Sequence, residues 1–185
     1  MKLKIKVKEI TPGCFPEINA NGDWIDLKSA INLTINAAQS GTLKKELSDN
    51  NTVKRYRNVD IPTYYIPLGI AMQLPKGFEA VVNSRSSVPK KLGVFIPNGQ
   101  GVIDNTYCGN NDQWYYIAAP MRNSAILKFD RVCQFRIQLS QKATFWQKMR
   151  WLFSSGVKLV KVDNLNNTNR GGLGSTGISG NTNKK

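Results

Sequence analysis

The sequence predicts an all-β fold, either a sandwich or a barrel of short strands. Several stretches alternate apolar and polar residues with the period of a half-buried strand. Glycine, proline and asparagine separate these stretches at short intervals, as turns do between strands. The length of 185 residues and a hydrophobic content of 41% are typical of a single soluble globular domain.

The N-terminal third contains two β-rich stretches and one polar segment. In KLKIKVKEI (2–10), lysines alternate with Leu, Ile and Val, which predicts a strand with lysines on its solvent face and suits a sheet edge. IDLKSAINLTI (25–35) is the second β-rich stretch. Residues 39–58 are polar and charged, so we expect a surface insertion with one short helix.

The remainder continues the β pattern with one exception. Residues 64–84 are expected to form two or three strands punctuated by Pro67, Gly69, Pro75 and Gly77, and residues 131–139 alternate clearly. The exception is TFWQKMRWLF (144–153), whose helical spacing of apolar residues predicts a short amphipathic helix. We expect its apolar face to pack against the body, with an aromatic, basic nucleic-acid surface as the alternative.

The domain organisation follows from these patterns. Residues 1–163 are expected to form one β-barrel domain with insertions at about 39–58 and 141–163. Residues 164–185 are rich in Gly, Asn, Ser and Thr and are expected to form a flexible C-terminal arm.

Composition excludes several chemistries. The chain has no histidine, so it has no Ser-His-Asp triad, Cys-His pair or histidine zinc site. A general base must therefore be Asp, Glu or a perturbed Lys, Tyr or Cys. Three widely spaced cysteines suggest neither a disulfide framework nor a zinc site. The sequence has neither a long apolar run nor a secretory signal, so a cytoplasmic protein is expected.

The net charge of +14 leaves two interpretations open. One is a polyanionic partner: a nucleic acid, a nucleotide or an acidic lipid. The other is a lysine-rich solvated surface.

Two aspartates and one polar loop are candidates for chemistry. Asp26 and Asp104 stand in apolar runs, where a carboxylate can serve a metal shell or act as a general base, although an Asp in such a place is more often a turn-forming residue. Arg85 with its neighbouring serines in SRSS offers donors for an anion, although an ordinary polar loop would look the same. The chain has no Walker A motif.

Five pieces taken in order resemble a known family. They are WIDLKSA, SRSSVPKKLGV, NGQGVIDNTYCGN, FDRVCQFRI and RGGLGSTG, and they resemble the five motifs of the homotrimeric dUTPase family. The resemblance implies a distorted β-barrel of jelly-roll type, assembled as a trimer with active sites at subunit interfaces. It also implies hydrolysis of dUTP to dUMP and pyrophosphate with Mg²⁺.

The resemblance assigns roles to individual residues. Asp104 matches the Asp that activates the attacking water, and Asp26 matches the Asp that holds the Mg²⁺ hydration shell through water. The residues that match substrate contacts are Arg85, Ser86, Ser87, Asn98, Gly101, Val102, Ile103, Tyr107, Gln134, Arg170, Gly172, Leu173, Ser175 and Thr176. The sequence departs from the family pattern at Ser87, usually Gly, at Thr106, commonly a second Asp, and at Leu173, normally aromatic.

Two alternatives compete with this interpretation. dCTP deaminases share the fold, but their chemistry needs a Glu after the third motif, and none lies between Asn105 and Pro120. A basic β-domain that binds nucleic acid or protein is the other alternative. The sequence favours a Mg²⁺-dependent dUTP diphosphatase with neither a membrane nor a nucleic acid as partner.

Overall fold

The computed structural model describes residues 1–20, 22–37, 39–47 and 53–172. Leu173, Ser175 and Thr176 lie outside them. The elements in chain order are β1 (Leu3–Glu9), β2 (Glu17–Ile18), β3 (Ile25–Lys28), β4 (Leu33–Ile35), β5 (Gln39–Leu47), β6 (Val53–Asp60), β7 (Tyr64–Gln73), β8 (Phe78–Ser84), α1 (Val88–Leu92), β9 (Val94–Phe95), β10 (Gly101–Ile103), β11 (Gln113–Pro120), β12 (Ser124–Ile126), β13 (Arg131–Leu139), α2 (Phe145–Leu152) and β14 (Val157–Lys161).

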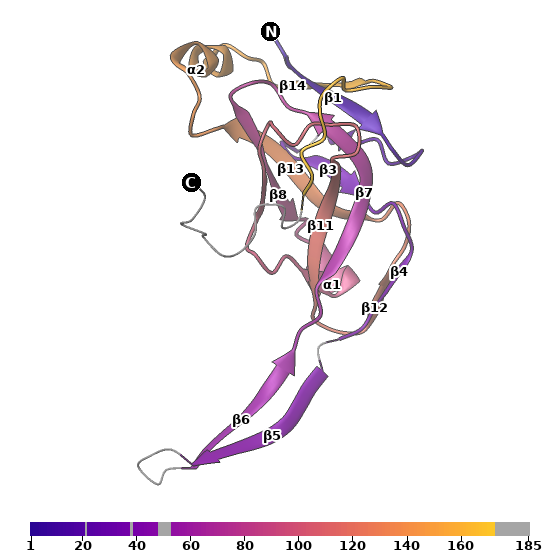
Figure 1. Ribbon diagram of the computed structural model, residues 1–185. Coiled ribbons are helices and arrows are strands. Elements are labelled where there is room, and N and C mark those ends of the chain that lie inside the picture. Colours follow the sequence, from indigo (N-terminus) through magenta and orange to yellow (C-terminus); the bar gives the residue numbers. More distant parts are fainter. Residues whose placement is uncertain (21, 38, 48–52, 173–185) are drawn as a thin grey trace.

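Two five-stranded sheets enclose the core. One has the order β14-β1-β7-β11-β9 and the other β10-β8-β13-β3-β2 (Figure 1). Their inner faces meet at Trp114 of β11 and Phe135 of β13, whose ring centroids lie 5.3 Å apart in an edge-to-face arrangement. The all-β prediction is confirmed, and the described sheets have a jelly-roll-like arrangement that does not close into a continuous barrel.

Strand β1 lies inside its sheet and not at the expected edge. Leu3, Ile5 and Val7 are fully buried, while Lys4 and Lys6 are exposed, so the predicted alternation is correct. β1 pairs antiparallel with β7 on one side and parallel with β14 on the other. The edge assignment was wrong because the partner strand lies at the far end of the sequence, where local pattern gives no information about pairing.

The long strand β7 runs through two of the expected break points. Pro67 and Gly69 both lie within it, and the strand ends at Gln73, before Pro75. Gly69 has a φ of +66°, and its carbonyl accepts hydrogen bonds from the N–H groups of Ile10 and Thr11. The register with β11 shifts at this level, so the glycine forms a bulge that bends the strand without ending it.

The polar segment after β4 forms a hairpin, which corrects the expectation of a short helix. β5 and β6 pair antiparallel from Gln39 opposite Asp60 to Leu47 opposite Val53. The residues of β6 include Tyr56 and Val59, which favour strands over helices. The hairpin extends away from the two main sheets at the end opposite α2 (Figure 1).

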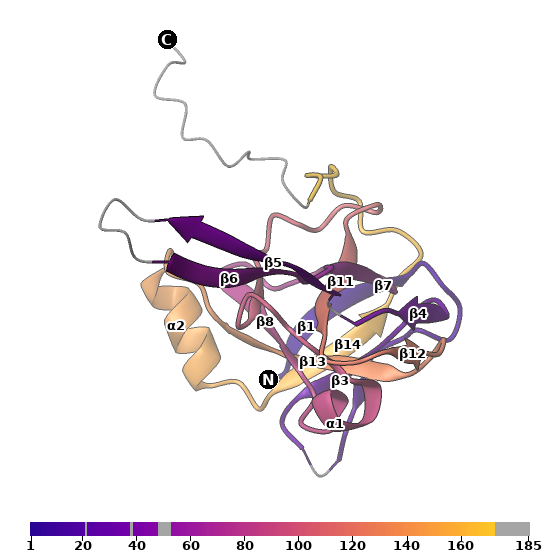
Figure 2. The same ribbon diagram turned by 90° about the horizontal axis from the view of Figure 1, so that it is seen from below.

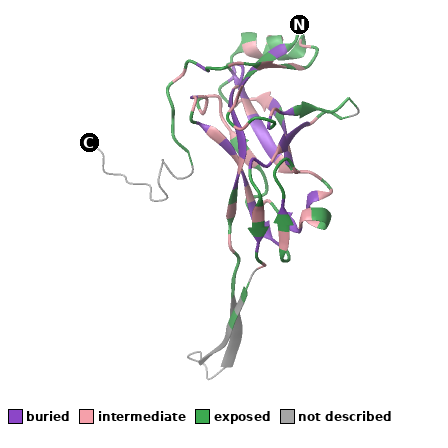
Figure 3. Cartoon of the chain, turned by 90° about the vertical axis from the view of Figure 1, so that its right-hand side faces the viewer, coloured by how far each residue is buried: buried purple, intermediate pink, exposed green. Residues whose placement is uncertain are grey.

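Helix α2 forms at the predicted place but presents an unexpected face to the body. A capping box starts it: Thr144 accepts from the Gln147 N–H and the Gln147 side chain accepts from the Thr144 N–H. Phe145 and Leu152 are 66% and 71% exposed, so the apolar face does not pack against the body as expected. Figure 3 shows the helix as largely exposed, and α1 and α2 lie at separate places on the sheets (Figures 1 and 2).

Two further expectations concern thiols and membranes. All three cysteines are free, as the spacing predicted. Within the described ranges, no helix is long and apolar enough to cross a membrane.

Candidate active site

A pocket of about 270 Å³ opens where β10 and β11 meet the start of the C-terminal arm. Its walls come from β8, β10, β11, the loops beside them and residues 170–172. The predicted residues that line it are Asn98, Gly101, Val102, Ile103, Asp104, Tyr107, Arg170 and Gly172. The third and fifth motifs therefore meet in one cavity within a single chain.

Asp104 follows the last residue of β10, at the rim of this pocket. One carboxylate oxygen, Oδ1, accepts from the Thr106 N–H at 2.8 Å and from the Thr106 hydroxyl at 2.5 Å. The other, Oδ2, is ion-paired with the guanidinium of Arg170. The turn after β10 and the arm thus fix the carboxylate from two sides.

These contacts decide the ionisation of Asp104. Partial burial opposes the charged form, but the donors of Thr106 and the guanidinium of Arg170 outweigh it and hold the pKa of Asp104 below its ordinary value. The carboxyl group is therefore ionised at neutral pH. An ionised, half-exposed carboxylate at a pocket rim can accept a proton from water.

Tyr107 supports both the pocket wall and the arm. Its hydroxyl donates to the Gln113 carbonyl at 2.8 Å, and burial raises the pKa of this phenol. Gly172 lies against the ring: a Cβ added there would be 2.9 Å from Oη and 3.0 Å from Cε2 of Tyr107. Only glycine allows the arm backbone to approach the ring this closely.

Asp112 anchors the arm to the loop after Tyr107. This carboxylate is 1% exposed and accepts hydrogen bonds from the N–H groups of Gly109, Arg170 and Gly171 at 2.8–3.1 Å. A Cβ on Gly109 would lie 2.5 Å from the Asn169 Cα, so the arm crosses directly over this glycine. Residues 169–172 therefore reach the pocket of their own chain.

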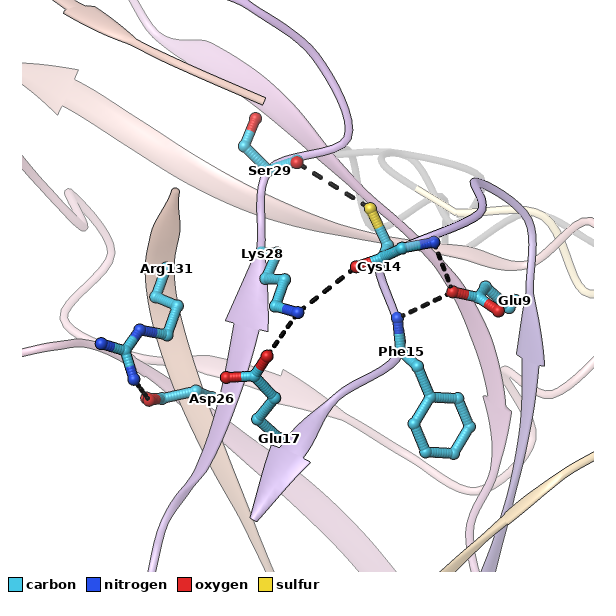
Figure 4. A network of polar contacts seen from close by, with 9 residues as sticks. Glu9, Cys14, Phe15, Glu17, Asp26, Lys28, Ser29 and Arg131 are labelled. Atoms are coloured by element: carbon cyan, nitrogen blue, oxygen red, sulfur yellow. Dashed lines mark hydrogen bonds and ion pairs between the residues drawn. The ribbon is translucent and has the colours of Figure 1, made fainter. Parts of the chain in front are cut away.

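A second cluster surrounds Asp26 in β3. Asp26 Oδ1 lies 2.8 Å from Arg85 Nε, and Oδ2 lies 3.1 Å from Arg131 Nη1. Figure 4 shows Arg131 directed at Asp26. It also shows a separate ion pair nearby, between Lys28 of β3 and Glu17 of β2. The Asp26 side chain is only 5% exposed, so both guanidinium groups compensate a buried charge.

Gln134 belongs to this second cluster. In the sheet it stands opposite Asp26 on one side and Asn83 on the other, and directly opposed residues share a face. Ser86 is exposed, and Ser87 is the N-cap residue of α1 without a side-chain cap hydrogen bond. None of Arg85, Ser86, Ser87, Gln134 and Asp26 lines the pocket at Asp104. The predicted residues therefore form two groups on one chain.

The described residues contain no group of three His, Cys, Asp or Glu side chains that could hold a metal ion. Asp26 has both oxygens paired with arginines, and Asp104 has both oxygens hydrogen-bonded. Protein side chains alone do not form a Mg²⁺ site in this part of the chain.

Sequence reasoning missed four contributors to the site. Thr106 entered only as a departure from the family, yet an Asp followed two residues later by a hydroxyl residue is the pattern of an Asp-capped turn. Asp112 and Arg131 act through partners distant in sequence, which no local pattern signals. Trp114 lines the pocket with a buried Nε1–H that has no partner in the described structure.

The fold and the site define a small all-β protein with a carboxylate-rimmed pocket. No protein-family model matches the chain. It is 38% identical over 177 residues to the "SPbeta prophage-derived deoxyuridine 5'-triphosphate nucleotidohydrolase YosS" of Bacillus subtilis (strain 168), covering 96% of this chain and 99% of that protein. A deoxyuridine 5'-triphosphate nucleotidohydrolase of Orientia tsutsugamushi (strain Boryong) is 33% identical over 118 residues, covering 63% of this chain and 70% of that protein. The chain belongs to the dUTPase family.

Solved structures agree on the fold. The dUTPase from Streptococcus mutans has a TM-score of 0.54 at 20% identity, covering 71% of this chain and 89% of that one. A point mutant of the dUTPase from phage phi11 of S. aureus has a TM-score of 0.56 at 15% identity, covering 76% and 94%, and is described with a structural Mg(II) ion. At these identities the likeness establishes the fold alone.

Proposed function

We propose that the chain hydrolyses dUTP to dUMP and pyrophosphate, with Asp104 activating the attacking water. The position of Asp104 carries the proposal: it is an ionised carboxylate at the rim of the pocket, held by Thr106 and reached by the arm. Family membership supports the substrate, since the relatives at 38% and 33% identity are named for dUTP hydrolysis.

The pocket suits a uracil nucleoside. Asn98 and the backbone of residues 101–103 form one wall, and the half-buried ring of Tyr107 forms another. Backbone N–H and C=O groups can pair with the edge of uracil, and close walls reject a thymine methyl or a ribose hydroxyl. Tyr107 is held by its bond to the Gln113 carbonyl, so the ring cannot swing away from the sugar position easily.

Arg85, Ser86, Ser87 and Gln134 would bind the triphosphate. These donors do not line the pocket of their own chain, which supports a homotrimer whose sites combine two groups from different chains. Arg85 is already paired with Asp26 and is therefore held in one orientation for a phosphate. Arg170 would leave the Asp104 carboxylate and bind a phosphate oxygen. Gly172 and the arm residues Leu173, Ser175 and Thr176 would contact the substrate together with it.

Mg²⁺ would be bound with the substrate. Because the described side chains form no metal site of their own, the triphosphate oxygens and water would supply most of the Mg²⁺ ligands. Mg²⁺ in nucleotide sites is usually bound in this way. Asp26 would contribute only through water, in keeping with its saturated oxygens. When bound, the ion would neutralise charge on the phosphates.

The same geometry disfavours deamination. Asp112, the only acid between Asn105 and Pro120, accepts hydrogen bonds from the backbone of Gly109, Arg170 and Gly171. Such a carboxylate is an anchor and not a proton shuttle.

Pyrophosphate release from dUTP, dTTP, UTP and dCTP tests the activity and its specificity. We expect turnover of dUTP with Mg²⁺ and little turnover of the other three. Equal turnover of dTTP would contradict the pocket assignment, and ammonia release from dCTP would contradict the reaction.

Mixing two inactive variants tests the shared site. We expect Asp104→Asn and Arg85→Gln chains to be inactive alone and to regain activity after they are unfolded and refolded together, because some sites then combine an intact Asp104 with an intact Arg85. A mixture as inactive as its parents would place the whole site within one chain.

A further inference from the structure

Helix α2 has one continuous apolar stripe. Phe145 and Met149 are four residues apart, as are Met149 and Phe153. Leu152 stands seven residues after Phe145, and Trp146 stands seven residues before Phe153. Residues at these spacings share a helix face. Phe145, Leu152 and Phe153 are 66–71% exposed and Trp146 is 79% exposed.

The stripe points away from the protein. Two residues of the opposite side contact the body: Gln147 packs on Gly77, and the ring centroid of Trp151 lies 5.4 Å from that of the buried Phe78. Each stands two positions from a stripe residue, and such positions lie on opposite sides of a helix. The helix is therefore docked by its more polar side, with its hydrophobic side in solvent, the reverse of an ordinary surface helix.

Cations border the stripe on both edges. Lys148 stands three residues after Phe145 and four before Leu152, which places it along one edge. Arg150 stands four after Trp146 and three before Phe153, which places it along the other edge. Both side chains are exposed, and neither makes an ion pair in the part of the chain that the structure describes.

A lysine surface lies next to this helix. Lys4, Lys6, Lys76 and Lys158 line a shallow groove over β1, β14 and the turn after β7, and Lys4 stands directly opposite Lys158. Lys76 precedes the glycine on which Gln147 packs, so groove and helix are neighbours. None of the four lysines pairs with a carboxylate among the described residues, although like charges placed opposite each other cost stability.

We propose that α2 and the adjoining lysines form a docking surface for an anionic lipid bilayer. A short helix with Trp, Phe and Leu on its outward side and basic residues along both edges lies in the plane of a membrane interface. Basic side chains then reach the headgroups while the apolar stripe enters the acyl boundary. A spanning segment is unnecessary for this mode of binding. The proposal differs from the sequence-based expectation of no membrane partner, and vesicle binding decides between the two.

Two other occupants fit the surface less well. Bases of single-stranded nucleic acid stack on open aromatic faces, but Phe145 and Trp146 pack edge-to-face on one another at 5.5 Å, and the rest of the stripe includes Met and Leu. A second copy of this chain would bring another uncompensated lysine groove toward this one, and like charges repel.

Vesicle binding of the full chain tests the proposal. We expect it to sediment with phosphatidylcholine vesicles that contain an equal share of phosphatidylglycerol, and not with pure phosphatidylcholine. The Trp146 emission should move to shorter wavelength on binding, and Trp146→Phe should remove most of that change while retaining binding. An absence of sedimentation at low salt would overturn the proposal.

Variants separate the stripe from the rest of the surface. The pair Phe145→Ser and Leu152→Ser should abolish vesicle binding, while Met121→Ser and Leu127→Ser, which remove similarly exposed side chains elsewhere, should leave it intact. Lys148→Gln and Arg150→Gln should each weaken binding about fivefold. Unchanged thermal unfolding and dUTP turnover in these variants would show that fold and catalytic site are preserved.

Two further outcomes would overturn the lipid assignment. One is loss of the native oligomer in the Phe145→Ser, Leu152→Ser variant, which would assign the stripe to an interface between copies. The other is binding of single-stranded DNA that these substitutions abolish while vesicle binding persists.

Discussion

Asp26 and Asp104 are both paired with arginine, but their surroundings differ. The Asp26 side chain is 5% exposed and is bracketed by Arg85 and Arg131 within a sheet. The Asp104 side chain is 44% exposed, and its one arginine comes from the arm at the end of the described chain. A buried charge cannot lose its partners without a large penalty, whereas an exposed one can exchange them with solvent or a ligand. We therefore expect Asp26 to act mainly on the stability of the fold and Asp104 to take part in the reaction.

Asp104→Asn should produce the largest change. Removal of the proton acceptor is expected to lower dUTP turnover by about 10²–10⁴-fold. The free energy of unfolding should change little, because the amide retains most of the shape and Asp104 is half-exposed. Pyrophosphate release and urea unfolding measure the two quantities. Near-normal turnover would mean that another group activates the water.

Asp26→Asn should act mainly on stability. Removing the charge leaves two guanidinium groups beside a buried neutral amide, and we expect a loss of about 3 kcal/mol in the free energy of unfolding. Glu17→Gln is the matched control, since it breaks the more exposed pair with Lys28 and should cost less than about 1 kcal/mol. Equal effects in urea unfolding would remove the distinction between the two carboxylate environments.

Arg170→Ala and Thr106→Val should shift the pH dependence of turnover. Both residues donate to the ionised Asp104, so removing either raises its pKa, and the acid limb of the kcat/KM profile moves to higher pH. The lowered pKa also stabilises the fold above the unfolded-state pKa of Asp104, and this contribution is lost as pH falls through the folded-state value. An unmoved acid limb in both variants would assign that limb to another group.

Gly172→Ala should have the smallest effect. The added Cβ would meet the Tyr107 ring at about 3 Å, which loosens the docked arm without touching Asp104. We expect KM for dUTP to rise by about two- to fivefold with little change in kcat. Gly22→Ala, whose Cβ meets only ordinary contacts at 3.8–4.0 Å, provides the control. A large fall in kcat would give the arm a direct part in the chemistry.

The sequence predicted those features that depend on local residue patterns and on the order of the motifs. The all-β class, the alternation of β1 and the position of α2 follow from periodicity, and periodicity is a property of neighbours in the chain. Motif order identified Asp104 and Asp26 as candidate site residues. It did not predict the large difference in burial between their side chains.

The rest depended on contacts between distant residues. The apolar stripe of α2 was visible in the sequence. Helical periodicity predicts which residues share a face, but it does not predict whether that face contacts the protein body or solvent. Asp112 holds the arm through backbone N–H groups almost sixty residues later, and no side-chain pattern announces such bonds. The hairpin of β5 and β6 was obscured by its charged composition, which resembles that of a polar loop or helix.

The parallel pairing of β1 with β14 has a consequence for synthesis. Leu3 pairs with Val157, and because the two residues are distant in sequence Val157 is synthesised long after Leu3. The first sheet therefore stays incomplete until β14 has been synthesised, and contacts of such sequence separation form slowly. During that interval one side of β1 is open to wrong partners. Charged side chains on an open strand edge discourage pairing with other chains, so Lys4 and Lys6 would have this effect while β14 is still missing, although the finished sheet does not need them as edge protection.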